Sequence, residues 1–170
     1  HCWTVARLTS SCSANWCWEI FPSKYSRTAE ILSLAASAEK GSEHPLGEAI
    51  VKAAEEKGLE IKAIEDFKAI PGHGIEVKID SRIVLLGNKK LMSEREVELG
   101  DLQYKANKLA DEGKTPMFLA IDSEIKGVVA VADTVKENSK KAIKVIHNMG
   151  IKVAMITGDN EKTAKAIAKE

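Results

Sequence analysis

Two pairs of strand patterns, each joined by an Asp-Ser dipeptide, constrain the fold of this chain more than any other feature. The pairs are residues 75–79 and 82–86 around Asp80-Ser81, and residues 117–121 and 125–131 around Asp122-Ser123. A link of two or three residues is too short for a crossover, so the strands of each pair must run antiparallel. Apolar and charged residues alternate in the first strand, which predicts a sheet with one buried face and one wet face.

Three helical patterns surround these strands. Thr28 fits the N-cap of a first helix, whose apolar face recurs every three or four residues until Gly41. Pro45 suits the first position of a second helix, because its φ is preset and it has no N–H to lose. Residues 93–96 spell a capping box, which predicts a third helix that continues to Gly113. Together, the strands and helices predict an α+β domain.

Towards the C-terminal end the pattern changes to alternating helix and strand. A helix is predicted over residues 142–149, and residues 151–156 form a continuous apolar run typical of a strand buried on both faces of a parallel sheet. Thr157, Gly158 and Asp159 follow directly. Ligands bind at the carboxyl ends of parallel strands, where these residues offer a hydroxyl, N–H groups and a carboxylate to a phosphate and its metal. An ordinary strand-to-helix turn is the simpler alternative.

Residues 1–27 do not match the rest of the chain. They hold all three cysteines and all three tryptophans, and they show no sustained period. The cysteine spacing contains no Cys-x-x-Cys pair, which disfavours a metal site, and an odd number of cysteines disfavours a disulfide framework. We therefore expect an atypical leader, foreign or disordered, followed by the α+β domain over 28–126 and part of an α/β domain over 127–170.

The composition excludes several classes of function. The chain has 170 residues, of which 44% are hydrophobic and 29% charged, and it can therefore bury a proper core. Its 25 basic residues balance its 25 acidic residues, so net charge gives no reason to expect a nucleic acid or an anionic membrane surface as a partner. No apolar run approaches the roughly 18 residues that a membrane helix needs. We expect a soluble domain.

The segment Ser42-Glu43-His44-Pro45 places a histidine beside a helix entrance. The unpaired N–H groups of such an entrance favour a polar or anionic ligand and disfavour a protonated imidazole. A neutral His44 ring can lie against a planar heterocycle, and the nearby Glu39 carboxylate can accept a hydrogen bond from an exocyclic amine. Taken alone, a His-Pro pair also fits a capped helix start, and a glutamate at a helix end is usually solvated.

A second candidate segment is Pro71-Gly72-His73-Gly74, between two strand patterns. Glycine permits positive φ and a close approach of the backbone to a ligand. Asn88 follows the return strand, where an amide side chain can cap a loop or touch a ligand. A lone Gly-x-Gly also fits a tight turn. The order and context of these motifs, rather than any one of them, predict a nucleotide pocket.

With these motifs the sequence resembles the heavy-metal-transporting P-type ATPases, and most closely their copper exporters. The resemblance covers about residues 28–170, and five motifs occur in the family's order: Ser42-Glu43-His44-Pro45, Pro71-Gly72-His73-Gly74, Gly87-Asn88, Ala132-Asp133-Thr134-Val135-Lys136 and Thr157-Gly158-Asp159-Asn160. It implies a nucleotide-binding domain, an antiparallel sheet flanked by helices, over 28–126. It further implies that 127–170 are part of a Rossmann-like phosphorylation domain, in the cytoplasmic portion of a membrane-embedded transporter.

The resemblance also implies roles for individual residues. Glu39 and His44 correspond to adenine contacts, and the full set of implied nucleotide-binding residues is Glu39, Ser42, Glu43, His44, Gly72, His73, Gly74 and Asn88. Asp133 resembles the hinge aspartate, and the implied catalytic residues are Asp133, Thr157, Gly158 and Asp159, with no metal ligands. The implied cofactors are ATP and, in the parent, Mg²⁺. The implied partners are an adenine nucleotide and the remaining phosphorylation, actuator and membrane domains, with no nucleic acid.

Two motifs of the family are not found in this sequence. The Asp-Lys-Thr-Gly-Thr segment, whose aspartate accepts the phosphoryl group, would stand where the leader lies, and the Gly-Asp-Gly-x-x-Asn-Asp magnesium loop would fall beyond Glu170. We therefore expect this chain to bind ATP without turning it over. A non-catalytic nucleotide-binding or regulatory protein of the same fold stays open as an alternative. A soluble phosphatase is disfavoured, because no Asp-x-Asp pair precedes the first helix.

Overall fold

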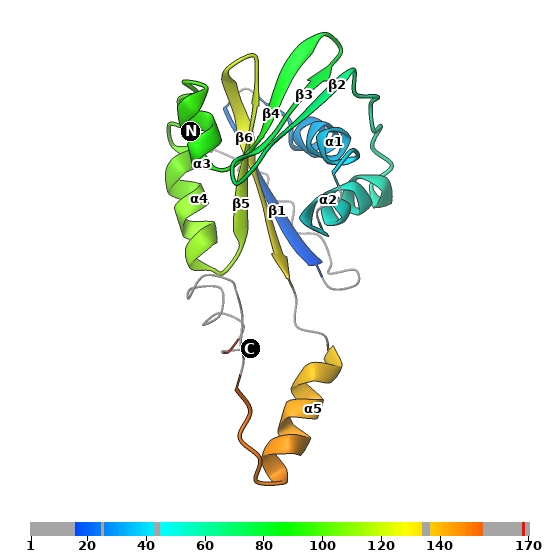
Figure 1. The fold of residues 1–170 in the computed structure, drawn as a ribbon, viewed down its shortest axis with the longest axis vertical. Helices are drawn as coiled ribbons and strands as arrows, with labels where there is room; N and C mark the ends of the chain where they lie inside the picture. The colour runs from blue at the N-terminus through cyan, green and yellow to red at the C-terminus, as the bar shows by residue number, and fades with distance from the viewer. Residues whose placement is uncertain (1–15, 25, 43–44, 134–136, 155–167, 169–170) are drawn as a thin grey trace, which may run out of the picture.

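A computed structural model of the protein describes residues 16–24, 26–42, 45–133, 137–154 and 168. Its strands are β1 (Trp16–Pro22), β2 (Asp66–Ile70), β3 (Gly74–Ile79), β4 (Arg82–Gly87), β5 (Thr115–Ile121) and β6 (Glu124–Asp133). In the described part of the chain they form one six-stranded sheet in the order β1-β6-β5-β4-β3-β2, and every neighbouring pair is antiparallel (Figure 1). The predicted antiparallel sheet is confirmed, but the predicted wet face is wrong for β4 and β5, whose side chains are buried on both faces.

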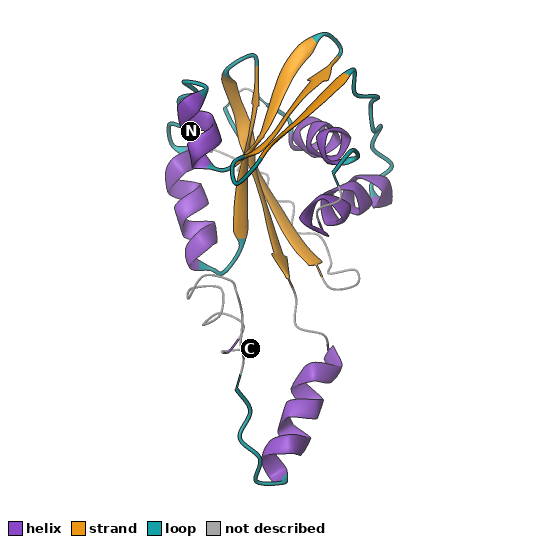
Figure 2. Ribbon diagram, in the orientation of Figure 1, coloured by secondary structure: helices purple, strands orange, loops and turns teal. Residues whose placement is uncertain are grey.

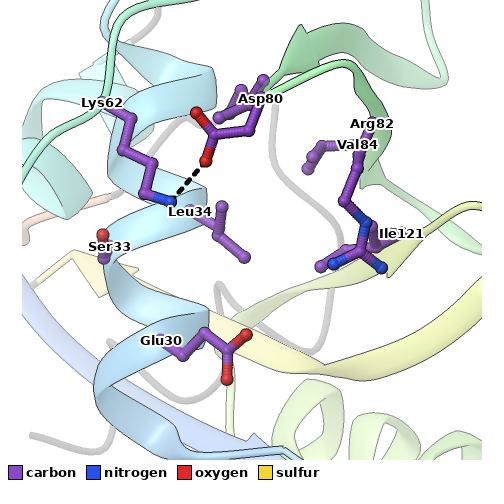
Figure 3. Close-up of a pocket in the computed structure, with 9 residues that line it drawn as sticks. Glu30, Ser33, Leu34, Lys62, Asp80, Arg82, Val84 and Ile121 are labelled. Atoms are coloured by element: carbon purple, nitrogen blue, oxygen red, sulfur yellow. Dashed lines mark hydrogen bonds and ion pairs between the residues drawn. The ribbon is translucent and has the colours of Figure 1, made fainter.

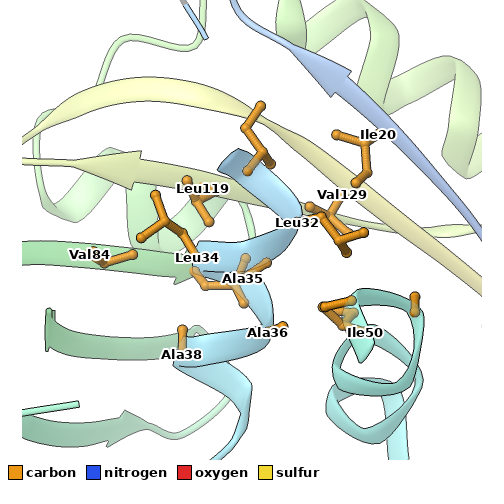
Figure 4. Packing of buried hydrophobic residues seen from close by; sticks show 14 of the residues in the cluster. Ile20, Leu32, Leu34, Ala35, Ala36, Ala38, Ile50, Val84, Leu119 and Val129 are labelled. Atoms are coloured by element: carbon orange, nitrogen blue, oxygen red, sulfur yellow. The ribbon is translucent and has the colours of Figure 1, made fainter. Parts of the chain in front are cut away.

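Two helical layers cover the opposite faces of this sheet (Figure 2). One layer holds α1 (Thr28–Glu39) and α2 (Pro45–Glu56), and the other holds α3 (Lys89–Glu94) and α4 (Leu102–Asp111). Successive side chains of β5 point to opposite faces of the sheet, so the strand contributes to both layers: Leu119 packs in the α1–α2 core and Phe118 in the α3–α4 core. On α1, Leu34 and Ala35 lie towards the strands, and Ile50 of α2 approaches the same helix (Figure 4).

Both predicted hairpins are present, and their links are tight turns with positive φ. The φ angles are 51° and 64° at Asp80 and Ser81, and 50° and 65° at Asp122 and Ser123. Two consecutive positive φ values match the right-handed twist of the flanking strands. Asp122 also reaches the neighbouring hairpin: its N–H donates to the Ile83 carbonyl (2.9 Å), and its carboxylate accepts from the Ile83 N–H (3.0 Å) and the Arg82 Nε (2.8 Å).

The expectation that residues 1–27 form a leader apart from the fold is wrong for Trp16–Pro22. These residues form the edge strand β1, which pairs with β6 from Trp16 opposite Asp133 to Pro22 opposite Gly127. Ile20 is fully buried in the α1–α2 core. The strand lacks a clean apolar–polar alternation, so only its distant partner β6 reveals it. The division into domains over 28–126 and 127–170 stays a prediction, and its boundary falls within β6.

Two further expectations need correction. Residues 93–96 end α3 instead of starting a long helix, because Glu96 and Gly100 take positive φ (55° and 50°) and α4 begins only at Leu102. After α5 (Glu137–Asn148), residues 151–154 form no strand, and the side chains of Ile151 and Val153 are exposed. A strand needs a neighbour for its backbone groups, and none of the described strands pairs with this segment. No helix among the described residues combines the length and hydropathy that crossing a bilayer requires.

Candidate functional site

The two glycines of the turn between β2 and β3 are required for different reasons. Gly72 has a φ of 74°, and a Cβ built on it would meet no atom within 4 Å. Gly74 has a φ of 144°, and its Cβ would overlap the Leu86 carbonyl oxygen and lie 2.5 Å from the Gly87 Cα. Gly74 therefore allows β3 to pair closely with β4, whereas the space beside Gly72 is open to a ligand.

Asn88 holds this turn from the far end of β4. Its Nδ2 donates to the Gly72 carbonyl (2.8 Å), and its backbone N–H donates to the His73 carbonyl (2.8 Å). Its Oδ1 accepts from the N–H groups of Lys90 (2.9 Å) and Leu91 (3.2 Å), so the same side chain is the N-cap of α3. Of the two roles considered for Asn88, the structure shows the cap.

His73, between the two glycines, also makes contacts within the protein. Its Nδ1 lies 2.9 Å from the Pro71 carbonyl oxygen, and its Nε2 lies 3.2 Å from Oε1 of Glu94 at the end of α3. The side chain of His73 is 27% exposed. Because both ring nitrogens face acceptor atoms of the protein, the imidazole supports the turn.

Glu39, the last residue of α1, is a buried carboxylate. It lies against Gly47 in the first turn of α2, where a Cβ would overlap Oε2 of Glu39 and lie 3.1 Å from its Cδ. Sequence analysis did not identify Gly47. The feature that could have identified it is a glycine inside a helical pattern. Such a glycine costs about 1 kcal/mol relative to alanine, so its presence indicates that another group approaches the helix closely.

The end of α1 lies next to the strand that leads into the glycine turn. A Cβ built on Gly41 would come within 3.3 Å of the Phe67 ring of β2. Ser42 is partly buried, and its N–H donates to the Glu39 carbonyl (2.9 Å). The structure thus forms two clusters, one of Gly72, His73, Gly74 and Asn88, and one of Glu39, Ser42 and Gly47, linked through β2.

Of the remaining predicted residues, the structure describes only Asp133. Glu43 and His44 lie outside the described residues, as do Thr157, Gly158 and Asp159. Asp133 is the last residue of β6, and its backbone is paired with Trp16. Among the residues that the structure describes, no group of three or more His, Cys, Asp or Glu side chains is arranged to hold a metal ion.

A cavity of about 90 Å³ lies at the opposite end of α1 from Glu39 (Figure 3). Glu30, in the first turn of α1, lines it together with the β3–β4 turn. Glu39 follows Glu30 by nine positions of the helix, a rise of roughly 13.5 Å. The rim carries ion pairs of Lys62 with Asp80 (2.5 Å) and of Arg82 with Asp122 (2.8 Å), and the hydrogen bond to Asp80 raises the pKa of Lys62. This cavity is separate from both clusters.

Comparison with known proteins identifies the family. A family model described as haloacid dehalogenase-like hydrolase matches residues 10–170. The chain belongs to this family. The chain is 51% identical over 146 residues to a copper-exporting P-type ATPase of Staphylococcus aureus strain MW2, and 50% identical to that of strain JH9. Each match covers 83% of this chain, which spans only 18% of the relative's length.

Solved structures of P-type ATPases have the same fold. A zinc-transporting PIB-type ATPase in its E2.Pi state superposes with a TM-score of 0.75 at 31% identity, over 88% of the present chain and 24% of the ATPase chain. The N-domain of a copper-transporting P-type ATPase gives 0.55 at 29% identity, over 65% and 94%. The catalytic domain of the CPx-ATPase CopB-B gives 0.56 at 25%, over 88% and 52%. The resemblance to metal-transporting P-type ATPases and the predicted fold class are confirmed.

Proposed function

We propose that this chain is the ATP-binding portion of a copper-exporting P-type ATPase and binds an adenine nucleotide between the end of α1 and the glycine turn. The observation that carries the proposal is the buried Glu39 carboxylate beside Gly47, at a helix end that lies against β2, the strand leading to Gly72. A relative's catalytic domain is described as changing conformation upon nucleotide binding, which supports the same ligand here.

In this proposal, each residue makes a different contribution to nucleotide binding. Glu39 accepts a hydrogen bond from the exocyclic amine of adenine, and His44 lies against the base. Gly72 leaves room for the ligand, since a Cβ there meets no atom within 4 Å. The base supplies most of the affinity, and the dissociation constant is on the order of 0.1 to 1 mM because an open cleft buries a small ligand only partly.

The intact parent would couple ATP hydrolysis to copper export through an aspartyl phosphate. In this proposal Asp133, Thr157, Gly158 and Asp159 belong to its phosphorylation side, and the chain lies in the cytoplasmic part beside actuator and membrane domains. Mg²⁺ would accompany the phosphates in the parent, where it supplies charge neutralisation. The described residues offer no cluster of three or more His, Cys, Asp or Glu side chains for that ion. The chain itself lacks the acceptor motif and binds ATP without turnover.

Calorimetric titration with ATP and GTP tests nucleotide binding. His44→Gln should weaken ATP binding by about 1 kcal/mol or more, the cost of a lost hydrogen bond or stacking contact. His147→Gln, at the exposed end of α5, is the matched control and should bind normally. Equal affinity for GTP and ATP together with an unaffected His44→Gln variant would show that the pocket is assigned wrongly.

Incubation with γ-labelled ATP tests the expected lack of turnover. After acid quenching, no label should remain with the protein, because no residue of the chain lies in an acceptor motif. Label that stays bound and disappears in an Asp159→Asn variant would reveal an acceptor and contradict this part of the proposal.

A further inference from the structure

The short helix α3 is bonded to the glycine turn at both of its ends. At its start, the N-cap Asn88 donates from Nδ2 to the Gly72 carbonyl and from its backbone N–H to the His73 carbonyl, both at 2.8 Å. At its end, Oε1 of Glu94 lies 3.2 Å from Nε2 of His73. Gly72 and its neighbour His73 are therefore held from both ends of α3.

α3 is itself fixed to the sheet. Its Leu91 and Met92 side chains are fully buried in the α3–α4 core. Arg95, the C-cap of α3, donates from Nη2 (2.7 Å) and Nε (3.1 Å) to Oε2 of Glu76 on β3, two residues after Gly74. Because α3 cannot shift without disturbing this packing and this ion pair, its bonds to the turn have fixed anchor points.

The side chain of Glu94 is suited to hold the turn without being needed for folding. It is 54% exposed, so the buried core does not depend on it. The His73 ring, whose other nitrogen lies 2.9 Å from the Pro71 carbonyl oxygen, is restrained on both sides only while Glu94 is present. Without Glu94 the imidazole keeps one of its two contacts, and the backbone between the two glycines is held by Asn88 without support from the ring.

We infer that Glu94 and Asn88 are positioning residues that hold the glycine turn in the conformation that receives the nucleotide. The inference rests on the proposed function, because it takes the adenine nucleotide as the ligand of that turn. Neither residue needs to touch the ligand: Glu94 acts through the His73 side chain, and Asn88 acts through the Gly72 and His73 carbonyls. The turn is thereby ordered before the ligand arrives, which lowers the entropic cost of binding.

Glu94→Ala tests this inference in the full chain, with Glu98→Ala as the matched control at another exposed glutamate just after α3. Amide resonances are first recorded without nucleotide, and ATP affinity is then measured by titration. Glu94→Ala should shift the Gly72 and Gly74 amides and lower ATP affinity about two- to fivefold, the size expected for an exposed ion pair. Glu94→Gln keeps an acceptor oxygen and should recover part of the loss, whereas Glu98→Ala should change neither readout.

The outcomes separate this inference from the proposed function. Unshifted Gly72 and Gly74 amides in the nucleotide-free Glu94→Ala variant would overturn the positioning role. Shifted amides with unchanged ATP affinity would also overturn it, since the turn would then be irrelevant to binding. If the unmodified chain binds no adenine nucleotide, the proposed function and the ligand named here both fail, while the nucleotide-free amide shifts still decide whether Glu94 holds the turn.

Discussion

Gly74 and Gly47 both occupy positions where a Cβ would overlap another group, but the groups differ in kind. At Gly74 the neighbours are the backbone atoms of Leu86 and Gly87, which are fixed by the ladder between β3 and β4. At Gly47 the neighbour is the carboxylate of Glu39, the far end of a side chain that has other rotamers. Where the neighbour is backbone, the glycine is needed for folding. Where the neighbour is a side chain, the glycine is needed for the orientation of that side chain.

The largest effect is expected from Gly74→Ala. Its new Cβ would overlap the Leu86 carbonyl oxygen at a φ of 144°, and neither strand can move away without losing pairs. The free energy of unfolding should fall by about 3 kcal/mol, from overpacking and strain together. Urea denaturation measures it. A Gly74→Ala variant that unfolds like the unmodified chain but no longer binds ATP would instead assign Gly74 to the ligand.

A comparable contrast exists between the buried Glu19 and the exposed Glu124, and Lys114→Met sharpens it. Glu19 is 4% exposed, and its carboxylate lies 2.8 Å from Nζ of Lys114, which also contacts Glu112 at 2.6 Å. Removing the lysine leaves a buried charge without this partner. Because the Lys114 side chain is 14% exposed, the free energy of unfolding should fall by about 2 kcal/mol, less than the roughly 3 to 5 kcal/mol of a fully buried pair. Lys126→Met, which breaks a pair with the exposed Glu124, is the control and should cost less than about 1 kcal/mol.

The stability effect of Lys114→Met should depend on pH in a way that follows from the environment of Lys114. Burial alone would lower the pKa of Lys114, but its hydrogen bonds to Glu112 and Glu19 outweigh burial and raise it above the ordinary value. The contribution of the ion pair is thus fully present below the ordinary lysine pKa and is lost as the pH rises through the raised one. The stability difference between Lys114→Met and the unmodified chain should be constant around neutrality and shrink only in strong alkali.

Gly47→Ala tests whether this glycine is needed for the orientation of the Glu39 side chain. Alanine gains about 1 kcal/mol of helix propensity, which offsets the displacement of Glu39, so the free energy of unfolding should change little. ATP affinity should fall about tenfold, because the carboxylate no longer points to the base. Glu48→Ala, on the exposed side of the same turn, is the control. Unchanged ATP affinity in Gly47→Ala would remove the functional role given to this glycine.

The smallest effect is expected from Gly72→Ala. Its φ of 74° costs an alanine about 1 kcal/mol, but the new Cβ meets no atom within 4 Å. Thermal unfolding should show a modest loss, well below that of Gly74→Ala. A loss as large as that of Gly74→Ala would mean that both glycines serve packing alone.

Features of this molecule that depend on residues close together in the sequence could be predicted from the sequence. Both hairpins and the helix start at Pro45 were predicted correctly, because turn chemistry and alternation are local. β1 was missed, since its pairing joins Trp16 to Asp133, far apart in the sequence. For the site, the motifs identified the glycine turn, but they could not show that Asn88 and His73 support the turn, nor that Gly47 lies against Glu39. Those contacts are set by tertiary packing.

The docking of Asp122 on the neighbouring hairpin has a consequence for strand register in acid. Its N–H and carboxylate add one step to the ladder between β4 and β5, and a slip by one residue would forfeit these bonds and move the apolar side chains to the opposite helical layer. The Arg82 guanidinium, followed by the Ile83 N–H, lowers the pKa of Asp122. This restraint is therefore complete above the ordinary aspartate pKa and lost only as the pH falls through the lowered one, so the alignment of the two hairpins persists in mildly acidic solution.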